Sequence, residues 1–446
     1  MLGLAAVLLR RGAQVSGTDR STSPAILNLR ERGVQVCFEQ TAESVPAETD
    51  LLVASAAIAA DHPEVREAQR RGLPVMKYAQ LLGALMAERR GIAISGTHGK
   101  STTTAWLAYT VRRAGLDPSF VIGADVEQLG GGSGVGDGPH FIAEACEYDR
   151  SFLNLAPTAA AILNIEEDHL DYYRHLDEIR DAFCDFARLL PHDGRLLING
   201  QDERSREVAE RIGRTAETFG LDPADTWCAA ALELEGGRYS YDLTHRGRSL
   251  GRVRLGLSGR HNVYNSLAVA GLAHWCGATF EQIRDGLAEF GGARRRLELR
   301  GVERGVAVAD DYAHHPTEIR ATLRAARERF TPKRLWCVFQ PHQHSRTRFL
   351  LADFAASFTQ ADRVVVPQIY FVRDSERDRE AVSGADLALR IRENGGLAVH
   401  IPEFADILQY LVQEAAPGDL VLTMGAGDIW KVADELLARL RNDLPA

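Results

Sequence analysis

Apolar residues along the chain alternate between short strand-like runs and longer helical stretches. The first helical stretch runs from Leu2 to Arg11 and is closed by Gly12, and a strand with the sequence AQVSGTD then ends at Asp19. The strand candidates that follow are 34–37, 51–54 and 73–76. Strands that alternate with helices predict a parallel, doubly wound α/β sheet. We therefore expect a small Rossmann-like domain over residues 1–88.

A second α/β domain is expected over residues 89–292. Its predicted strands are 92–95, 141–145, 160–165 and 195–200, and its closing helices are 262–276 and 280–290. Between them, the segment LGGGSGVGDG (129–138) is too rich in glycine for a helix or a central strand and predicts a loop.

The last part of the chain, residues 293–446, predicts a third, Rossmann-like domain. Its predicted strands are 306–313, 335–340, 363–369 and 419–425, and its predicted helices are 316–330, 350–358 and 429–440. The order of these elements again indicates a parallel sheet covered by helices.

Composition agrees with three packed domains and excludes some classes of partner. The chain has 446 residues, of which 45% are hydrophobic and 25% charged, as in ordinary soluble proteins. Its formal net charge of -9 gives no indication of the excess of positive charge that is typical of proteins that bind nucleic acid. No apolar run approaches the roughly 20 residues of a membrane span, and the six cysteines form no CxxC pair. We expect a cytoplasmic protein with reduced thiols and no membrane insertion.

The sequence GTHGKSTTT (96–104) is the strongest chemical signal in the chain. It follows an apolar strand and opens a helical stretch, so backbone N–H groups and the helix N-terminus can surround phosphate oxygens. Lys100 can reach the β- and γ-phosphates, and the Ser101 hydroxyl can bind Mg²⁺. The central domain is therefore expected to be of the P-loop ATPase type. The residues expected at ATP in this loop are Gly96, Thr97, His98, Gly99, Lys100, Ser101 and Thr102.

This loop and six further motifs resemble the Mur ligase family, in the family's order and over nearly the whole chain. The further motifs are EACEYDRSFL (144–153), NIEEDHLDYY (164–173), HNVYNSLAV (261–269), DDYAHHPTE (310–318), FQPHQHSRTR (339–348) and MGAGDIW (424–430). The resemblance implies a UDP-sugar-binding first domain, an ATP-binding central domain and an amino-acid-binding third domain. It also implies Lys100 as a catalytic residue.

Candidate metal ligands stand at the ends of two predicted strands in the central domain. Glu144 ends one strand and His169 follows another, and such ends face the same crevice as the phosphate loop. The resemblance implies one Mg²⁺ bound by Ser101 and Glu144 and a second Mg²⁺ bound by His169, which is also implied to be catalytic. Glu147 and Asp149 remain competing carboxylates. Cys146 and Tyr148 depart from the family's usual EADESD, but the expected ligand is retained.

Two groups flank the boundary between the second and third domains. His261, Asn262 and Asn265 lie near the start of a predicted helix, where they can cap the helix; the resemblance implies contact with adenine and ribose. A basic triplet follows at 294–296, which can be a solvated charge run. In the family such an arginine reaches the γ-phosphate, and both Arg295 and Arg296 are candidates.

Histidine and arginine follow two strands of the third domain and suit an anionic ligand, because a guanidinium binds a carboxylate through two hydrogen bonds. By the resemblance, the amino-acid pocket consists of Tyr312, His314, His342 and Arg346. Zinc is disfavoured here because Cys partners and a closed four-ligand spacing are missing.

The motifs at 164–173 and 310–318 most resemble the branch of the family that joins L-alanine to the carboxylate of UDP-N-acetylmuramate through an acyl phosphate. The implied cofactors are ATP and Mg²⁺. Asp19 and His98 are the residues implied at the UDP-sugar, and a monomer or homodimer is expected.

One alternative is a ligase that recycles murein peptides. Another is a non-catalytic homologue that binds UDP-sugars, because the expected first strand and glycine loop do not precede Met1; a misassigned start is the other explanation. A nicotinamide dehydrogenase is disfavoured because the chain has no GxGxxG.

Overall fold

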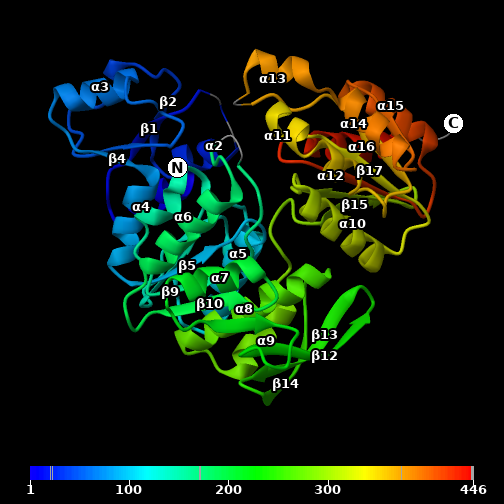
Figure 1. Ribbon diagram of the computed structural model, residues 1–446. Coiled ribbons are helices and arrows are strands. Elements are labelled where there is room, and N and C mark those ends of the chain that lie inside the picture. Colours follow the sequence, from blue (N-terminus) through cyan, green and yellow to red (C-terminus); the bar gives the residue numbers. More distant parts are fainter. Residues whose placement is uncertain (21, 23, 170–171, 373, 443–446) are drawn as a thin grey trace.

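The computed structural model describes residues 1–20, 22, 24–169, 172–372 and 374–442. The chain forms three lobes in sequence order, each built from strands and helices (Figure 1). The first and third lobes lie on opposite sides of the view, and the central lobe lies below and between them (Figure 1). The three-domain α/β fold predicted from the sequence is confirmed.

The N-terminal domain has short strands and shares its core with the central domain. Its elements are α1 (Leu2–Arg10), β1 (Ser16–Thr18), α2 (Pro24–Glu31), β2 (Gln35–Cys37), η1 (Ala42–Ser44), β3 (Leu52–Ala54), α3 (Pro63–Arg70), β4 (Val75–Lys77) and α4 (Tyr78–Ala87). β1 pairs with β2 and β3 with β4, both in parallel, so the sheet consists of two separate pairs. Leu4 of α1 and Leu82 of α4 belong to the same buried cluster as Ala93 and Phe141 of the central domain.

The central domain is built on a ten-stranded sheet in the order β14-β13-β12-β11-β10-β9-β5-β8-β6-β7. Its first half comprises β5 (Arg90–Ser95), α5 (Lys100–Arg113), β6 (Ser119–Val121), η2 (Glu127–Leu129), β7 (Ser133–Gly134), β8 (His140–Glu144), η3 (Tyr148–Asn154) and β9 (Ala159–Ile162). Its second half comprises α6 (Leu176–Arg188), β10 (Arg195–Asn199), α7 (Glu203–Arg211), β11 (Glu217–Gly220), β12 (Trp227–Glu235), β13 (Arg238–His245), β14 (Arg248–Arg254), α8 (Arg260–Cys276) and α9 (Phe280–Glu289).

Both faces of the parallel part of this sheet are covered, which explains why its strands are almost wholly apolar. Successive residues of β5 point to opposite faces. Ile92 and Ile94 belong to one core with Trp106 of α5, whereas Ala93 belongs to the other core with Phe183 of α6. β5 lies between β8 and β9, so the carboxyl ends of these three strands are neighbours.

The C-terminal domain has a six-stranded sheet in the order β15-β16-β20-β17-β18-β19, in which only β15 is antiparallel. Its elements up to β18 are β15 (Glu298–Glu303), β16 (Val306–Asp311), α10 (Pro316–Phe330), β17 (Leu335–Phe339), α11 (His344–Phe349), α12 (Leu351–Ala355) and β18 (Arg363–Val366). The remaining elements are α13 (Glu376–Ala381), α14 (Gly384–Glu393), β19 (Ala398–His400), α15 (Phe404–Glu414), β20 (Leu420–Met424) and α16 (Trp430–Asn442). β20 lies between β16 and β17, which places the segments after β16 and β17 on either side of the same strand end.

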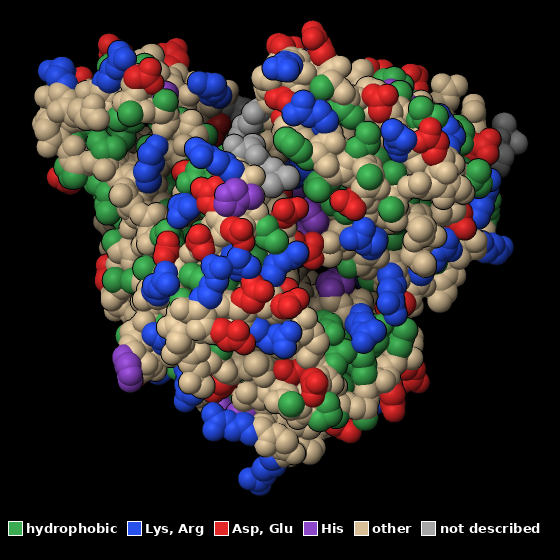
Figure 2. Space-filling model, in the orientation of Figure 1, with side chains coloured by type: hydrophobic (Ala, Val, Ile, Leu, Met, Phe, Trp, Pro, Cys, Tyr) green, Lys and Arg blue, Asp and Glu red, His purple; other side chains and the backbone are tan. Residues whose placement is uncertain are grey.

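Acidic and basic side chains are interspersed over the face shown in Figure 2, without a large area of one sign. Among the helices of the described residues, none is long and apolar enough to cross a membrane.

Candidate active site

The loop from Gly96 to Gly99 joins β5 to α5 in a conformation that needs glycine at both ends. Gly96 has a φ of 138° and Gly99, the N-cap of α5, has a φ of 84°, in the region that side chains with a Cβ rarely adopt. A Cβ at Gly99 would also lie 2.8 Å from Oδ1 of Asn265. The loop therefore presents backbone N–H groups at a helix N-terminus, as phosphate binding requires.

Asn164, which follows β9, holds this loop in place. Its Oδ1 accepts a hydrogen bond from the N–H of His98 at 2.8 Å, and its Nδ2 donates to the carbonyl of His98 at 3.1 Å. The carbonyl of Asn164 accepts from the N–H of Thr97 at 2.9 Å. The Thr97 hydroxyl in turn accepts from the N–H of Glu166 at 2.8 Å. The loop is thus rigid on the side that faces β9.

The ammonium group of Lys100 lies back over the loop. Its Nζ donates to the carbonyls of Gly96 and Thr97, at 2.6 and 3.0 Å, and lies 2.9 Å from Oε2 of Glu147. Burial alone would lower the pKa of Lys100, but the charges of Glu147 and Glu144 outweigh it and raise that pKa above its ordinary value. Lys100 is therefore a fixed positive charge beside the phosphate-binding loop.

Of the three carboxylates at the end of β8 and just after it, namely Glu144, Glu147 and Asp149, Glu147 is the one enclosed in the protein. Its side chain is 3% exposed and also lies 3.6 Å from Nε2 of His169. Burial raises the pKa of Glu147, yet Lys100 and His169 reverse this effect and hold it below the ordinary value. Glu144 ends β8, is half-buried, and accepts a hydrogen bond from the N–H of Gly123 at 2.9 Å. Asp149 is exposed.

The start of α8 lies against the nucleotide loop. Asn262 and Asn265 are buried, and Nδ2 of Asn265 donates to Oδ1 of Asn262 at 2.9 Å. Asn262 in turn donates to the carbonyl of Ser258 at 2.7 Å. His261 is exposed on the same turn. The amides thus support the beginning of α8, and the imidazole is open to a ligand.

The two candidate arginines have different surroundings. Arg295 donates to Asp310 at 2.8 Å and to the carbonyl of Gly425 at 2.6 Å, so its guanidinium is engaged within the C-terminal domain. Arg296 instead reaches across the domain junction, and its Nη2 lies 3.4 Å from the Ser101 hydroxyl. Tyr312 lies beside both guanidinium groups. Only Arg296 of this pair contacts the nucleotide loop.

The four residues expected around an amino acid lie together. The ring of His314 lies 5.4 Å from that of Tyr312 and 6.1 Å from that of His342. Nη1 of Arg346 lies 3.5 Å from Nδ1 of His342. Burial lowers the pKa of His314 to about 4, with Glu318 opposing and Arg346 adding to the effect, so its imidazole is neutral near pH 7.

Arg346 also forms a buried ion pair with the central domain. Its Nη2 and Nε donate to Oδ1 of Asp168, at 2.7 and 3.2 Å, and both side chains are less than a tenth exposed. Burial would raise the pKa of Asp168, but Arg346 holds it well below its ordinary value. The cluster of Tyr312, His314, His342 and Arg346 is therefore linked directly to the segment after β9.

His98 of the nucleotide loop forms a second link to the C-terminal domain. Its Nδ1 lies 3.2 Å from Oε1 of Glu318 on α10, and its Nε2 lies 3.5 Å from Oε2 of Glu166. Burial favours the neutral ring, but these two carboxylates outweigh it and raise the pKa of His98 to about 9. Glu166 itself is destabilised as an anion by burial, yet His98 lowers its pKa to about 2.

This link predicts a pH-dependent stability. The pKa of His98 lies above its ordinary 6.5, so its stabilising effect is complete below pH 6.5 and is lost as the pH rises through about 9. The contribution of Glu166 is complete above pH 4.5, so it does not vary at alkaline pH. We expect the urea midpoint of the wild type to exceed that of His98→Asn at pH 6, and the gap to narrow by pH 10. A gap that stays constant over this range would contradict the prediction.

Asp19, expected at the UDP-sugar, follows β1 in the N-terminal domain, where its N–H donates to the carbonyl of Cys37 at 3.1 Å. Leu170 and Asp171, within the motif at 164–173, lie outside the described residues. Sequence reasoning singled out His169 of that motif and left aside Asn164, Glu166 and Asp168, which hold the loop and the domain junction. Their position in the sequence could have indicated them, because they directly follow a strand whose carboxyl end faces the phosphate loop.

A glycine-rich phosphate loop at the head of a helix, facing a second α/β domain that carries arginines and histidines, defines a multidomain nucleotide-dependent enzyme. The chain belongs to the Mur ligase family. Residues 1–90 match the model described as "Mur ligase family, catalytic domain", 94–273 the "Mur ligase middle domain", and 295–427 the "Mur ligase, glutamate ligase domain". The members of this family are ATP-dependent ligases.

Curated relatives and solved structures agree with this membership. A UDP-N-acetylmuramate–L-alanine ligase of Lachnospira eligens is 42% identical, over 98% of this chain and 95% of that protein. One of Acetivibrio thermocellus is 39% identical, over 98% and 93%. The crystal structure of a UDP-N-acetylmuramate–alanine ligase from Thermotoga maritima superimposes with a TM-score of 0.82 at 25% identity, over 98% of this chain and 95% of that one. A murein peptide ligase from Psychrobacter arcticus shares the fold, with a TM-score of 0.73 and 24% identity, over 100% and 97%.

Proposed function

We propose that this protein joins L-alanine to the carboxylate of UDP-N-acetylmuramate with ATP, giving ADP and phosphate. The observation that carries the proposal is the direct contact between the nucleotide loop and the C-terminal domain. Arg296 approaches Ser101, and His98 approaches Glu318, so the terminal phosphate and the amino-acid pocket would meet at one junction. The domain over residues 1–88 would then hold the sugar nucleotide, the domain over residues 89–292 would hold ATP, and the domain over residues 293–446 would hold the amino acid.

The residues beside the loop suit Mg²⁺, because hydroxyl and carboxylate oxygens are the ligands that this ion prefers. The Ser101 hydroxyl is buried on the loop, and the Glu144 carboxylate is close enough to raise the pKa of Lys100. We assign Ser101 and Glu144 to one Mg²⁺ and His169 to a second. A bound Mg²⁺ would neutralise charge between the phosphates and the incoming carboxylate.

In the first step, the sugar carboxylate attacks the γ-phosphorus of ATP, the bond from that phosphorus to ADP breaks, and an acyl phosphate and ADP are formed. A carboxylate is a poor electrophile, and its phosphorylation supplies a good leaving group. The protein's part is alignment and stabilisation of phosphoryl charge. The loop N–H groups and Lys100 hold the phosphates, and Arg296 approaches from the C-terminal domain.

In the second step, the amine of L-alanine attacks the acyl phosphate, and phosphate leaves. Arg346 pairs with the alanine carboxylate, while Tyr312, His314 and His342 surround it. With a pKa of about 4, the imidazole of His314 is too weak a base to take a proton from an ammonium group and keep it. Its neutral nitrogen is suited to accept a hydrogen bond from the amine and to orient it.

The test is phosphate release from ATP and UDP-N-acetylmuramate with each amino acid in turn, at fixed enzyme and Mg²⁺. We expect release that depends on L-alanine. Release only with a preformed murein tripeptide would replace the proposal with a recycling ligase, and no release with any acceptor would favour a non-catalytic homologue. A cytoplasmic location, where ATP is available, and a monomeric or homodimeric state go with this proposal.

The neighbouring arginines give a matched pair of variants. Arg296→Ala removes the guanidinium at the loop, and we expect kcat to fall about 100-fold or more, as when one charge-stabilising donor is lost. Arg295→Ala breaks contacts inside the C-terminal domain, so its main effect should be a lower unfolding midpoint. Steady-state kinetics and thermal unfolding of both variants distinguish these roles. Equal loss of kcat in the two variants at unchanged stability would reverse the assignment.

A further inference from the structure

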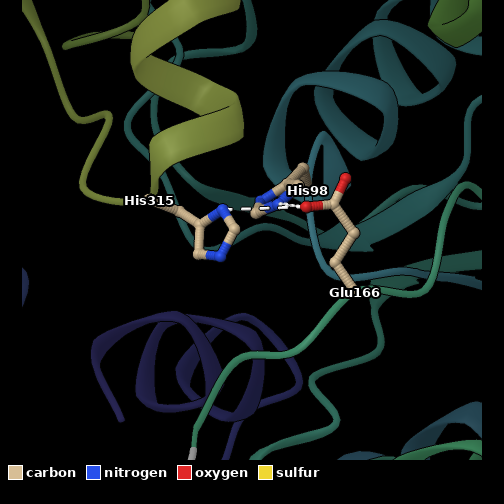
Figure 3. A group of neighbouring side chains, drawn as sticks. All are labelled: His98, Glu166 and His315. Carbon is tan, nitrogen blue, oxygen red and sulfur yellow. Dashed lines mark ion pairs between the residues drawn. The ribbon is translucent and has the colours of Figure 1, made fainter. Parts of the chain in front are cut away.

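Three side chains gather where the nucleotide loop meets the C-terminal domain. His98 comes from the loop, Glu166 from the segment after β9, and His315 from the residue before α10 (Figure 3). One nitrogen of each histidine and one carboxylate oxygen lie within 4.8 Å of one another. The two chemical steps proposed above use neither Glu166 nor His315.

The hydrogen bonds of the two rings determine which nitrogens face the cluster. Nδ1 of His98 faces the Glu318 carboxylate at 3.2 Å, and Nε2 of His315 faces the carbonyl of Glu167 at 3.2 Å. Both partners can only accept, so these two nitrogens carry protons. The lone pairs of a neutral His98 at Nε2 and of His315 at Nδ1 then point toward Glu166. A histidine whose remote N–H bonds a carboxylate or a carbonyl is the usual arrangement of a metal ligand.

The nitrogen of His98 that faces the cluster is poorly satisfied by the protein. Its Nε2 is fully enclosed and has no partner of hydrogen-bonding geometry among the described residues. Oε2 of Glu166 lies 3.5 Å from this atom and 3.8 Å from Nδ1 of His315. Ligand atoms about 2.0–2.1 Å from a tetrahedral ion lie about 3.3 Å apart. The two distances from Oε2 of Glu166 are close to this value, and the three ligand atoms all lie within 4.8 Å of one another.

We propose that His98, Glu166 and His315 form a site for a divalent transition ion of the zinc or cobalt class, joining the central and C-terminal domains. Two imidazoles and one carboxylate suit these ions better than Mg²⁺, which prefers oxygen. Glu166 is 29% exposed, so solvent can supply a fourth ligand. The ion would replace the proton of His98 and the long 3.3 Å hydrogen bond from the N–H of Thr317 to His315.

The site is distinct from the two proposed Mg²⁺ positions, whose ligands are Ser101, Glu144 and His169. Its ligands come from both sides of the domain junction, so an ion here would hold the nucleotide loop against α10. The carboxylate of Glu318, on the far side of His98, adds negative charge that favours the cation. The inference goes beyond the proposed function, since it concerns metal binding by the protein without its substrates.

The probe is Co²⁺, whose visible absorption reports tetrahedral binding through nitrogen, with excess Mg²⁺ present to occupy oxygen-rich sites. The full-length wild type is compared with Glu166→Gln, which keeps the acceptor for Thr317, and with His315→Gln. His192→Ala, which removes an exposed histidine elsewhere, is the matched control. We expect one visible band at one equivalent of Co²⁺ in the wild type and the control, and at least tenfold weaker binding in the two site variants.

A second measurement protects the conclusion if His315→Gln is poorly folded. Zn²⁺ should raise the thermal unfolding midpoint of the wild type and of His192→Ala, and the rise should be lost in Glu166→Gln. The proposal is overturned if the wild type shows no tetrahedral Co²⁺ band. It is equally overturned if Glu166→Gln binds Co²⁺ as tightly as the wild type does, because the ion would then lie elsewhere.

Discussion

Lys100→Ala is expected to lower kcat about 100- to 1,000-fold, the loss typical of removing one group that stabilises charge in a transition state. Lys100 is the cation of the nucleotide loop, and the charges of Glu147 and Glu144 keep it protonated well beyond neutral pH. The alanine variant keeps the backbone N–H groups of the loop, so ATP should still bind, more weakly. Steady-state kinetics together with a direct ATP-binding measurement separate the two effects.

The same substitution should also destabilise the fold, because it leaves Glu147 enclosed without its main cation. Removing one partner of a buried ion pair lowers the free energy of unfolding by about 3–5 kcal/mol. Without Lys100 the pKa of Glu147 should rise, so the loss of stability should shrink as the pH falls and Glu147 takes up a proton. Urea unfolding of Lys100→Ala at pH 5 and pH 8 measures this difference.

The double variant Lys100→Ala/Glu147→Gln is the control that separates catalysis from folding. It removes both charges, so stability should recover toward that of the wild type while kcat stays low. If kcat recovers together with stability, Lys100 acts only by neutralising Glu147, and its role at the phosphates is refuted.

The nucleotide loop and the strands around it could be predicted from the sequence because local rules determine them. Gly96 and Gly99 are required by backbone conformation, and fully buried parallel strands appear as continuous apolar runs. The carboxyl ends of parallel strands share one edge of a sheet, so the pattern also predicts that the ends of β5, β8 and β9 lie at the same edge, although it does not give the order of these strands. The site residues on these elements remain a prediction until they are tested by substitution.

Features that depend on contacts between distant segments could not be predicted. Which of Arg295 and Arg296 reaches Ser101 depends on the direction of the backbone at Arg295, whose φ is 59°. The hydrophobic periodicity of the sequence does not predict such a backbone conformation.

The antiparallel strands β12–β14 were missed for a different reason. Tyr239, Tyr241 and Leu243 of β13 are buried and alternate with less buried residues, which is a strand pattern that the prediction from the sequence did not use. The expected helix at 350–358 is instead α12, which is separated from α11 by the non-helical Leu350.

The pairing of Arg346 with Asp168 joins residues 178 positions apart and gives the second large effect that we expect. Arg346→Ala should raise the KM for L-alanine about 10- to 150-fold, because a charge-assisted hydrogen bond to a carboxylate contributes about 1.5–3 kcal/mol. Arg346→Lys keeps the positive charge but loses the planar guanidinium that donates two parallel hydrogen bonds, so it should recover only part of the affinity for L-alanine. The KM for ATP should change much less. Initial rates with either substrate varied check this.

Asp168→Asn tests whether the ion pair and the alanine carboxylate compete for the same guanidinium. The variant keeps the shape of the side chain but removes its charge, so Arg346 should bind alanine more strongly and the KM for alanine should fall. Stability should fall as well, because Arg346 is only 8% exposed and loses its buried partner. An unchanged KM for alanine in both Asp168→Asn and Arg346→Ala would show that Arg346 only joins the two domains, and the carboxylate would then need another partner in the pocket.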